Sequence, residues 1–167
     1  MNLRLLMLKL FNVSNKVFNA ANQQERLLTP DYIVGLVDGE GYFSVTARLY
    51  NYRNYSSYEV KMIFGIDIKE SDGDILKQVQ KYFGCGYLNR KVDKRENFSP
   101  QIMYQVRKHQ DVLEKIIPFF QKHPLRIASK QKRFKYFVKI GEIVARREYR
   151  KPKGFKKVQE LVAKMRQ

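Results

Sequence analysis

The chain has 167 residues, with 33 lysines and arginines against 16 aspartates and glutamates, a formal net charge of +17. Hydrophobic residues make up 44% and include eleven Tyr and eleven Phe, which excludes a disordered basic tail. The single cysteine, Cys85, excludes a disulfide scaffold, and Lys9 interrupts the longest apolar run before it could span a membrane. A folded domain this basic usually binds a polyanion, namely DNA, RNA or an anionic membrane surface.

Residues 1–28 are predicted to be an N-terminal extension, and residues 29–167 to form one domain. The extension is rich in leucine and has no acidic residue before Glu25. Such a composition is typical of a short apolar helix or of an organellar transit peptide. Arginine is scarce in this stretch, so a helix docked on the domain or a frayed extension is the preferred interpretation.

The domain is predicted to begin with a helix. Thr29-Pro30-Asp31 supplies a hydroxyl N-cap, a proline at the first helical position and an acid in the first turn. The two glycines of Asp38-Gly39-Glu40-Gly41 predict where this helix ends. Apolar and polar residues then alternate over residues 42–50 and 58–69, which indicates two half-buried strands joined by a polar turn.

The rest of the chain continues with further strands and helices, separated by glycines and prolines. In chain order these are a helix at 72–83, strands at 87–92 and 101–107, and helices at 111–121, 129–146 and 155–165. Pro124 and Pro152 are taken to mark breaks. This order of elements predicts an α+β fold in which an antiparallel sheet has all its helices on one face and leaves the other face free.

The strand residues predicted on the free face are almost all hydrogen-bonding. They are Ser44, Thr46, Arg48, Tyr50, Lys61, Asn89, Lys91, Gln101, Gln105 and Arg107. A curved sheet with these side chains could read base edges in a major groove. Together with the net charge, this inventory favours a nucleic acid over a membrane as the partner.

The end of the first helix carries the most specific motif. Ile33-Val34-Gly35-Leu36-Val37-Asp38-Gly39-Glu40-Gly41-Tyr42-Phe43 resembles the signature of the LAGLIDADG homing endonucleases. The predicted αββαββα order is also that of this family, so the resemblance covers roughly residues 29–165. It implies a saddle-shaped sheet and metal-dependent hydrolysis of double-stranded DNA at a long pseudo-palindromic target, which leaves 3′ overhangs.

The resemblance also implies a dimer. Gly35 and Gly39 lie four residues apart on one helix face, where another backbone can approach closely. In the family two such helices pack side by side, and this sequence holds one copy of the motif. We therefore expect a homodimer whose interface includes Val34, Gly35, Asp38 and Gly39. Val34, bulkier than the usual alanine, would shift that contact, and Asp38 is expected to make structural hydrogen bonds there.

Glu40 stands at the position of the family's metal-binding acid. Two such carboxylates, related by a dimer axis, would repel each other unless divalent cations lay between them. The Glu40 carboxylate and the Gly39 carbonyl are hard oxygen ligands that suit Mg²⁺, with Mn²⁺ or Ca²⁺ as substitutes in binding.

A lysine near the metal is expected to stabilise negative charge on the phosphate. Residues 123–132 resemble the segment that supplies this lysine in the family. Lys130 fits best, with Ser129 as a helix cap; Lys132 is the alternative, and a solvated surface lysine is the competing interpretation.

Asp67 and Lys69 stand where relatives often carry Gln or His near the scissile phosphate. Lys69 is therefore a candidate phosphate contact, and Asp67 is a candidate member of the solvent network.

Two other functions fit the same fold. One is an intron maturase or RNA-binding protein, with intron RNA as partner, and the other is a non-catalytic DNA-binding protein. The presence of Glu40 and Lys130 favours cleavage. The resemblance further implies an organelle, either mitochondrion or chloroplast, or the bacterial cytoplasm as the location, and no secretion.

Overall fold

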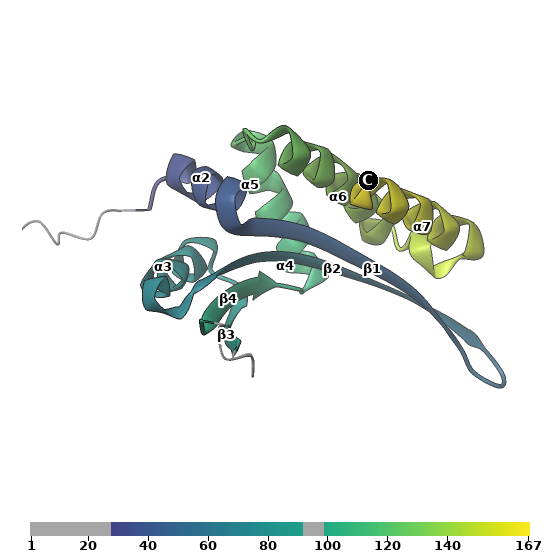
Figure 1. Cartoon of the computed structure of the whole chain (residues 1–167). Helices are drawn as coiled ribbons and strands as arrows, with labels where there is room; N and C mark the ends of the chain where they lie inside the picture. Colours follow the sequence, from purple (N-terminus) through teal and green to yellow (C-terminus); the bar gives the residue numbers. More distant parts are fainter. Residues whose placement is uncertain (1–27, 92–98) are drawn as a thin grey trace, which may run out of the picture.

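A computed structural model describes residues 28–91 and 99–167 of the chain (Figure 1). The predicted N-terminal extension lies outside the described residues except for Leu28, as does most of the segment between the strands predicted at 87–92 and 101–107. In the two described ranges, none of the helices combines the length and the apolar character that crossing a bilayer requires.

The predicted α+β order is confirmed. The strands are β1 (Gly41–Asn51), β2 (Ser56–Lys69), β3 (Tyr87–Lys91) and β4 (Gln101–Val106). The helices are α2 (Pro30–Glu40), α3 (Asp74–Phe83), α4 (His109–Asp111), α5 (Ile117–Lys122), α6 (Ala128–Ala145) and α7 (Pro152–Arg166). A π-helical turn, Val112–Ile116, joins α4 to α5, and 3-10 turns occupy Glu70–Asp72 and Glu148–Arg150.

Two helix ends differ from expectation. Pro152 marks a helix boundary as predicted, but it is itself the first residue of α7, which therefore begins three residues earlier than the predicted helix at 155–165. Ser129, predicted as a helix cap, lies inside α6, whose N-cap residue is Ile127. No side chain of the described residues caps α6; the backbone N–H of Ile127 itself donates to a carboxylate oxygen of Asp38 on α2.

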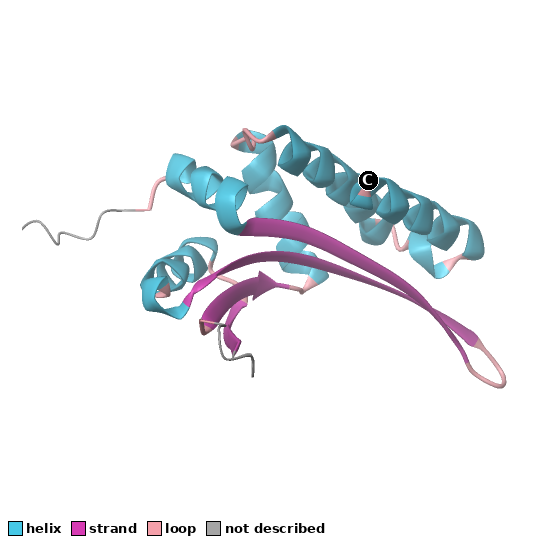
Figure 2. Ribbon diagram, in the orientation of Figure 1, coloured by secondary structure: helices cyan, strands magenta, loops and turns pink. Residues whose placement is uncertain are grey.

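The sheet has the strand order β1-β2-β4-β3 and is antiparallel throughout. The register places Tyr42 opposite Gly65, Gly65 opposite Gln105, and Gln105 opposite Tyr87. One row of four residues therefore crosses all four strands near the start of β1. Figure 2 shows the long β1–β2 hairpin continuing beyond the helices at its far end.

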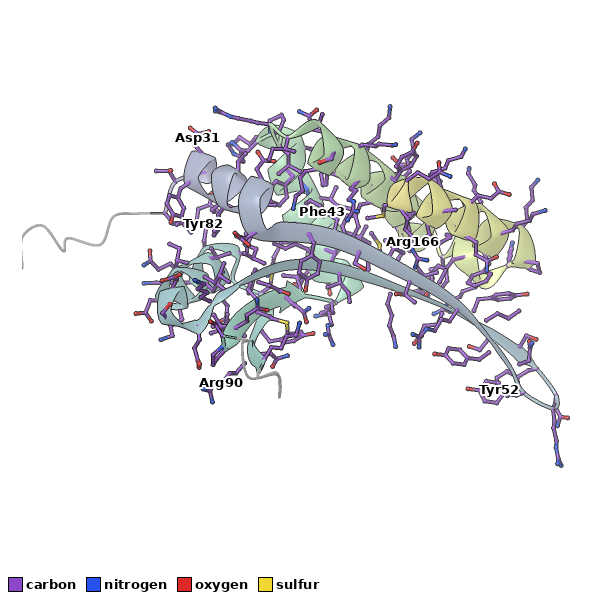
Figure 3. The ribbon with its side chains drawn as sticks, viewed as in Figure 1. Asp31, Phe43, Tyr52, Tyr82, Arg90 and Arg166 are labelled. Carbon is purple, nitrogen blue, oxygen red and sulfur yellow. The ribbon has the colours of Figure 1, made fainter. Side chains whose placement is uncertain are left out.

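An aromatic core holds the helices against one face of the sheet. Phe43 of β1 points between sheet and helices (Figure 3). Its ring contacts those of Phe64, Phe120, Phe134 and Phe137 at centroid distances between 5.1 and 5.5 Å. Clustered rings of this kind bury large apolar areas and fix the elements that carry them. Because Phe43 lies just after α2 and Phe134 lies in the first turns of α6, the cluster fixes the end of α2 relative to the start of α6.

Candidate active site

The end of α2 presents the predicted metal-binding acid to solvent. The side chain of Glu40 is exposed and makes no hydrogen bond or ion pair with any residue that the structure describes. The last turn of α2 contains no basic residue to offset the negative end of the helix dipole. An unpaired carboxylate at the negative end of a helix makes this place attractive to a cation.

Lys130 reaches the same place from α6. Its ammonium group donates a hydrogen bond to the carbonyl oxygen of Gly41, the residue directly after Glu40. Lys132 is exposed and has no hydrogen-bond partner within residues 28–91 and 99–167. Of the two lysines that the sequence left open, Lys130 is therefore the one that lies next to Glu40.

Asp38 explains why the start of α6 lies so close to the end of α2. Its side chain is buried, with 8% of the residue exposed. Its carboxylate oxygens accept hydrogen bonds from the backbone N–H groups of Arg126, at 2.8 Å, and Ile127, at 3.3 Å. The structural hydrogen bonds expected of Asp38 thus exist within one chain, and they hold the turn that precedes Lys130.

Replacing Asp38 by alanine is expected to lower the free energy of unfolding by about 2–3 kcal/mol, because two backbone N–H groups lose a buried, charged acceptor. For a domain of this size the melting temperature should fall by about 5–10 °C. Asp31→Ala is the matched control, since Asp31 is exposed on the same helix and lies 3.9 Å from Arg126; it should change stability by less than about 1 kcal/mol. An equal loss of stability in the two variants would contradict the role of Asp38 in holding the turn before α6.

Asp67 and Lys69 lie at the end of β2 that is nearest to α2. Gly41 is opposite Ile66, so Asp67 stands beside the junction of α2 and β1. Burial raises the pKa of the Asp67 carboxyl, while a hydrogen bond with Tyr42 and the charge of Lys91 oppose that shift. Its Oδ1 oxygen has no hydrogen-bond partner in the part of the chain that the structure describes. Lys69 is exposed two residues further on.

The register places the predicted base-reading residues on the sheet face opposite the aromatic core. Most are exposed or half-buried, and some are paired there: Glu59 accepts from Tyr50 at 3.2 Å and forms an ion pair with Lys61 at 3.2 Å. Gln105 is the exception, since only 6% of it is exposed. The prediction of an exposed Gln105 is therefore wrong, because the side chains of neighbouring strands cover it.

Comparison with known proteins decides the family. The sequence profile of the LAGLIDADG endonucleases matches residues 33–141. The chain belongs to the LAGLIDADG endonuclease family. It is 30% identical over 135 residues, or 78% of its length, to "Probable intron-encoded endonuclease 2" of Neurospora crassa. It also resembles the crystal structure of the homing endonuclease I-TnaI at 32% identity and a TM-score of 0.70, covering 84% of this chain and 89% of that one.

A second solved relative is I-SmaMI bound to uncleaved DNA target in the presence of calcium ions, with 27% identity and a TM-score of 0.72 over 83% of this chain. The match covers 45% of the I-SmaMI chain and 26% of the Neurospora protein. The chain therefore spans about a quarter to a half of the length of these two relatives.

The LAGLIDADG helix α2 has one face turned away from its own chain. Gly35 and Gly39 are exposed, and a Cβ atom added at either would meet nothing within 4 Å. Val34 and Asp38, predicted with them as interface residues, point into the chain and are 3% and 8% exposed. Helical periodicity groups Gly35 and Gly39 with Tyr32 and Leu36 instead.

Several aromatic residues of this LAGLIDADG-family chain were not singled out by the sequence. Tyr42 and Tyr87 lie on the free face of the sheet, and both contact Gln105. Tyr52 and Tyr55 stack at the tip of the β1–β2 hairpin, with ring centroids 4.6 Å apart. Alternation places Tyr42 on the face of Ser44 and Tyr87 on the face of Asn89, but their contacts depend on strand order, which no local signal supplies.

Proposed function

We propose that this chain carries the nuclease site of a site-specific endonuclease that hydrolyses both strands of DNA. The observation that carries the proposal is the exposed, unpaired carboxylate of Glu40, with the ammonium group of Lys130 bonded to the carbonyl oxygen of the next residue, Gly41. A carboxylate at a helix C-terminus opposes the helix dipole, so its presence there favours a functional role over a structural one. The site stands at the edge of a sheet face rich in side chains that can contact bases.

The oxygen atoms at the end of α2 fit a hard divalent cation. The Glu40 carboxylate and the Gly39 carbonyl are ligands of the kind that Mg²⁺ prefers, and that Mn²⁺ and Ca²⁺ also accept. Across the described ranges, no group of three or more His, Cys, Asp or Glu side chains could hold a metal ion by itself. The remaining ligands would be water, phosphate oxygens and a second Glu40. When bound, the ion would polarise the scissile phosphate and lower the pKa of a water ligand.

The side chains around Glu40 have separate tasks in this proposal. Lys130 stabilises negative charge that develops on the phosphate, and its bond to the Gly41 carbonyl keeps it beside Glu40 while other ammonium hydrogens stay available. Lys69 contacts a phosphate at the same end of the sheet. Asp67, half-buried at the same end of the sheet, would join the solvent network there.

We further propose that α2 packs against α2 of a second copy through Tyr32, Gly35, Leu36 and Gly39. Two sheets would then lie in successive major grooves, so that the target is long and pseudo-palindromic, and cleavage across the minor groove would leave 3′ overhangs. The intron-encoded Neurospora relative supports an organelle as the location of this chain.

A selection experiment tests the proposed function. The chain is incubated with Mg²⁺ and a library of randomised duplexes, and the cut ends are sequenced. We expect one long target, cut on both strands with 3′ overhangs, and steeply salt-dependent binding. Specific binding without cleavage would indicate a DNA-binding protein that has lost catalysis. If no duplex is bound or cut but intron RNA is, the maturase alternative takes the place of the endonuclease.

The two lysines should behave differently in the same assay. Lys130→Met is expected to reduce the cleavage rate by about 100-fold, because a charge next to the reacting phosphate is lost while the length of the side chain is kept. Lys132→Met removes the same charge two residues along α6 and should change the rate by only a few fold. Single-turnover rates at saturating protein measure both, and a larger loss at Lys132 would reverse the assignment.

A further inference from the structure

A hydrogen-bonded row of side chains crosses the free face of the sheet close to Glu40. The Gln105 side-chain amide donates to the Tyr42 hydroxyl. The Gln105 Oε1 oxygen accepts from the Tyr87 hydroxyl at 3.3 Å and from Nη2 of Arg107 at 2.6 Å. The Arg107 guanidinium also lies over the Tyr87 ring, 5.1 Å from its centroid. Three strands thus contribute to one network around Gln105.

Gly65 allows a residue of β1 to join this network. Gly65 lies on β2, between Tyr42 of β1 and Gln105 of β4. A Cβ atom on Gly65 would collide with the ring of Tyr42, which means that the tyrosine ring crosses the sheet where β2 has no side chain. Burial raises the pKa of the Tyr42 hydroxyl, and the nearby Asp67 carboxyl raises it further.

These contacts prevent Gln105 from reading a base. A glutamine that recognises adenine needs its amide oxygen and nitrogen free to form two parallel hydrogen bonds. Gln105 is 6% exposed, its oxygen already accepts two hydrogen bonds, and its nitrogen donates to Tyr42. Arg107 is exposed, and its remaining N–H groups bond to no residue that the structure describes.

We propose that Arg107 recognises a guanine in the major groove, and that Gln105 and Tyr87 are positioning residues that hold its guanidinium. The inference rests on the proposed DNA endonuclease function. A guanidinium fixed in orientation can donate two parallel hydrogen bonds to O6 and N7 of guanine. Because the row begins at Tyr42, two residues after Glu40, this guanine lies in the part of each half-site nearest to the cut.

The proposal is tested by measuring base preference at every position of the selected target. Competition binding in Ca²⁺ compares the four base pairs at each position for the wild type, Arg107→Ala and Arg90→Ala. Arg90→Ala is the matched control, because Arg90 lies on β3 with its side chain on the opposite face, paired with Glu70 at 2.7 Å. Arg107→Ala should lose about ten-fold or more of the preference for guanine at one inner position. Arg90→Ala should keep the wild-type profile.

The positioning role of Gln105 has its own readout. Gln105→Leu removes the oxygen that holds Arg107, so it should weaken the preference for guanine at the same inner position as Arg107→Ala does. Gln105→Glu keeps an acceptor for Arg107 and should preserve the guanine preference, although the added negative charge weakens binding at all sites. Arg107 is exposed, and without it Gln105 Oε1 still accepts from Tyr87, so the alanine variant should fold with a melting temperature only a few degrees lower, by about 2–4 °C, and can be interpreted even where a Gln105 variant folds poorly.

Two results would overturn the proposal while leaving the endonuclease intact. A uniform loss of affinity in Arg107→Ala, with a shallower salt dependence, would make Arg107 a phosphate contact. If Gln105→Leu instead lost a preference for adenine at a different position of the target, Gln105 would be a base-reading residue. A wild-type chain that prefers no sequence at all would instead contradict the proposed function itself.

Discussion

Replacing Glu40 by glutamine is expected to reduce the rate of DNA cleavage by at least about 1,000-fold, or about 4 kcal/mol of activation free energy. Glutamine keeps the size of the side chain and removes the negative charge that would hold the metal ion. Because Glu40 is exposed and unpaired among the described residues, its replacement should leave the fold intact. Affinity for the selected target in Ca²⁺ should stay within a few fold of the wild type, since base and phosphate contacts come from other side chains.

Glu160→Gln provides the matched control for this change. Glu160 is an exposed acid of α7 that forms no hydrogen bond or ion pair within the described ranges. Its loss alters the net charge by the same amount and should leave cleavage unchanged. A chelator should abolish cleavage by the wild type and by Glu160→Gln alike. If Glu40→Gln still cuts at the wild-type rate, the acid is no metal ligand; if it loses DNA binding as well, its role lies in binding.

The parts of the fold that depend on local signals could be predicted from the sequence. Thr29 accepts the hydrogen bond from the Tyr32 N–H that its position as N-cap implies. The alternation over residues 42–50 and 58–69 gave strands with the correct inward faces, because a period of two leaves only two choices for each strand. The motif in turn gave the place of Glu40, at the last position of α2.

The parts of the site that depend on tertiary contacts could not be predicted in the same way. Gln105 is buried because a tyrosine from β1 crosses β2, which requires both the strand order and the absence of a side chain at Gly65. The choice of Lys130 over Lys132 depends on where Asp38 holds the turn before α6. Val34 was taken as an interface residue because the motif gives positions along the helix, whereas the rotation of the helix is set by its packing.

The second large effect is expected on self-association of the chain through α2. Replacing Gly35 by leucine should weaken self-association by about 100-fold or more, because each copy would place a bulky side chain between two closely packed helices. The isolated chain should tolerate the change, since a Cβ atom at this position meets nothing within 4 Å. Sedimentation velocity at micromolar concentration should show a dimer for the wild type and a monomer for the variant. Circular dichroism should show the same helix content for both.

Gly35→Ala distinguishes a packed helix face from a solvated one. On a solvated helix, alanine in place of glycine should stabilise the fold by about 0.5–1 kcal/mol. Between two α2 helices the added methyl groups should keep the backbones apart and weaken the dimer, so stability of the monomer and association change in opposite directions. Ala163→Leu, at an exposed position of α7, serves as the control and should leave association unaffected. A wild-type chain that stays monomeric at all concentrations, or a Gly35→Leu variant that stays dimeric, would show that this face of α2 is not the interface.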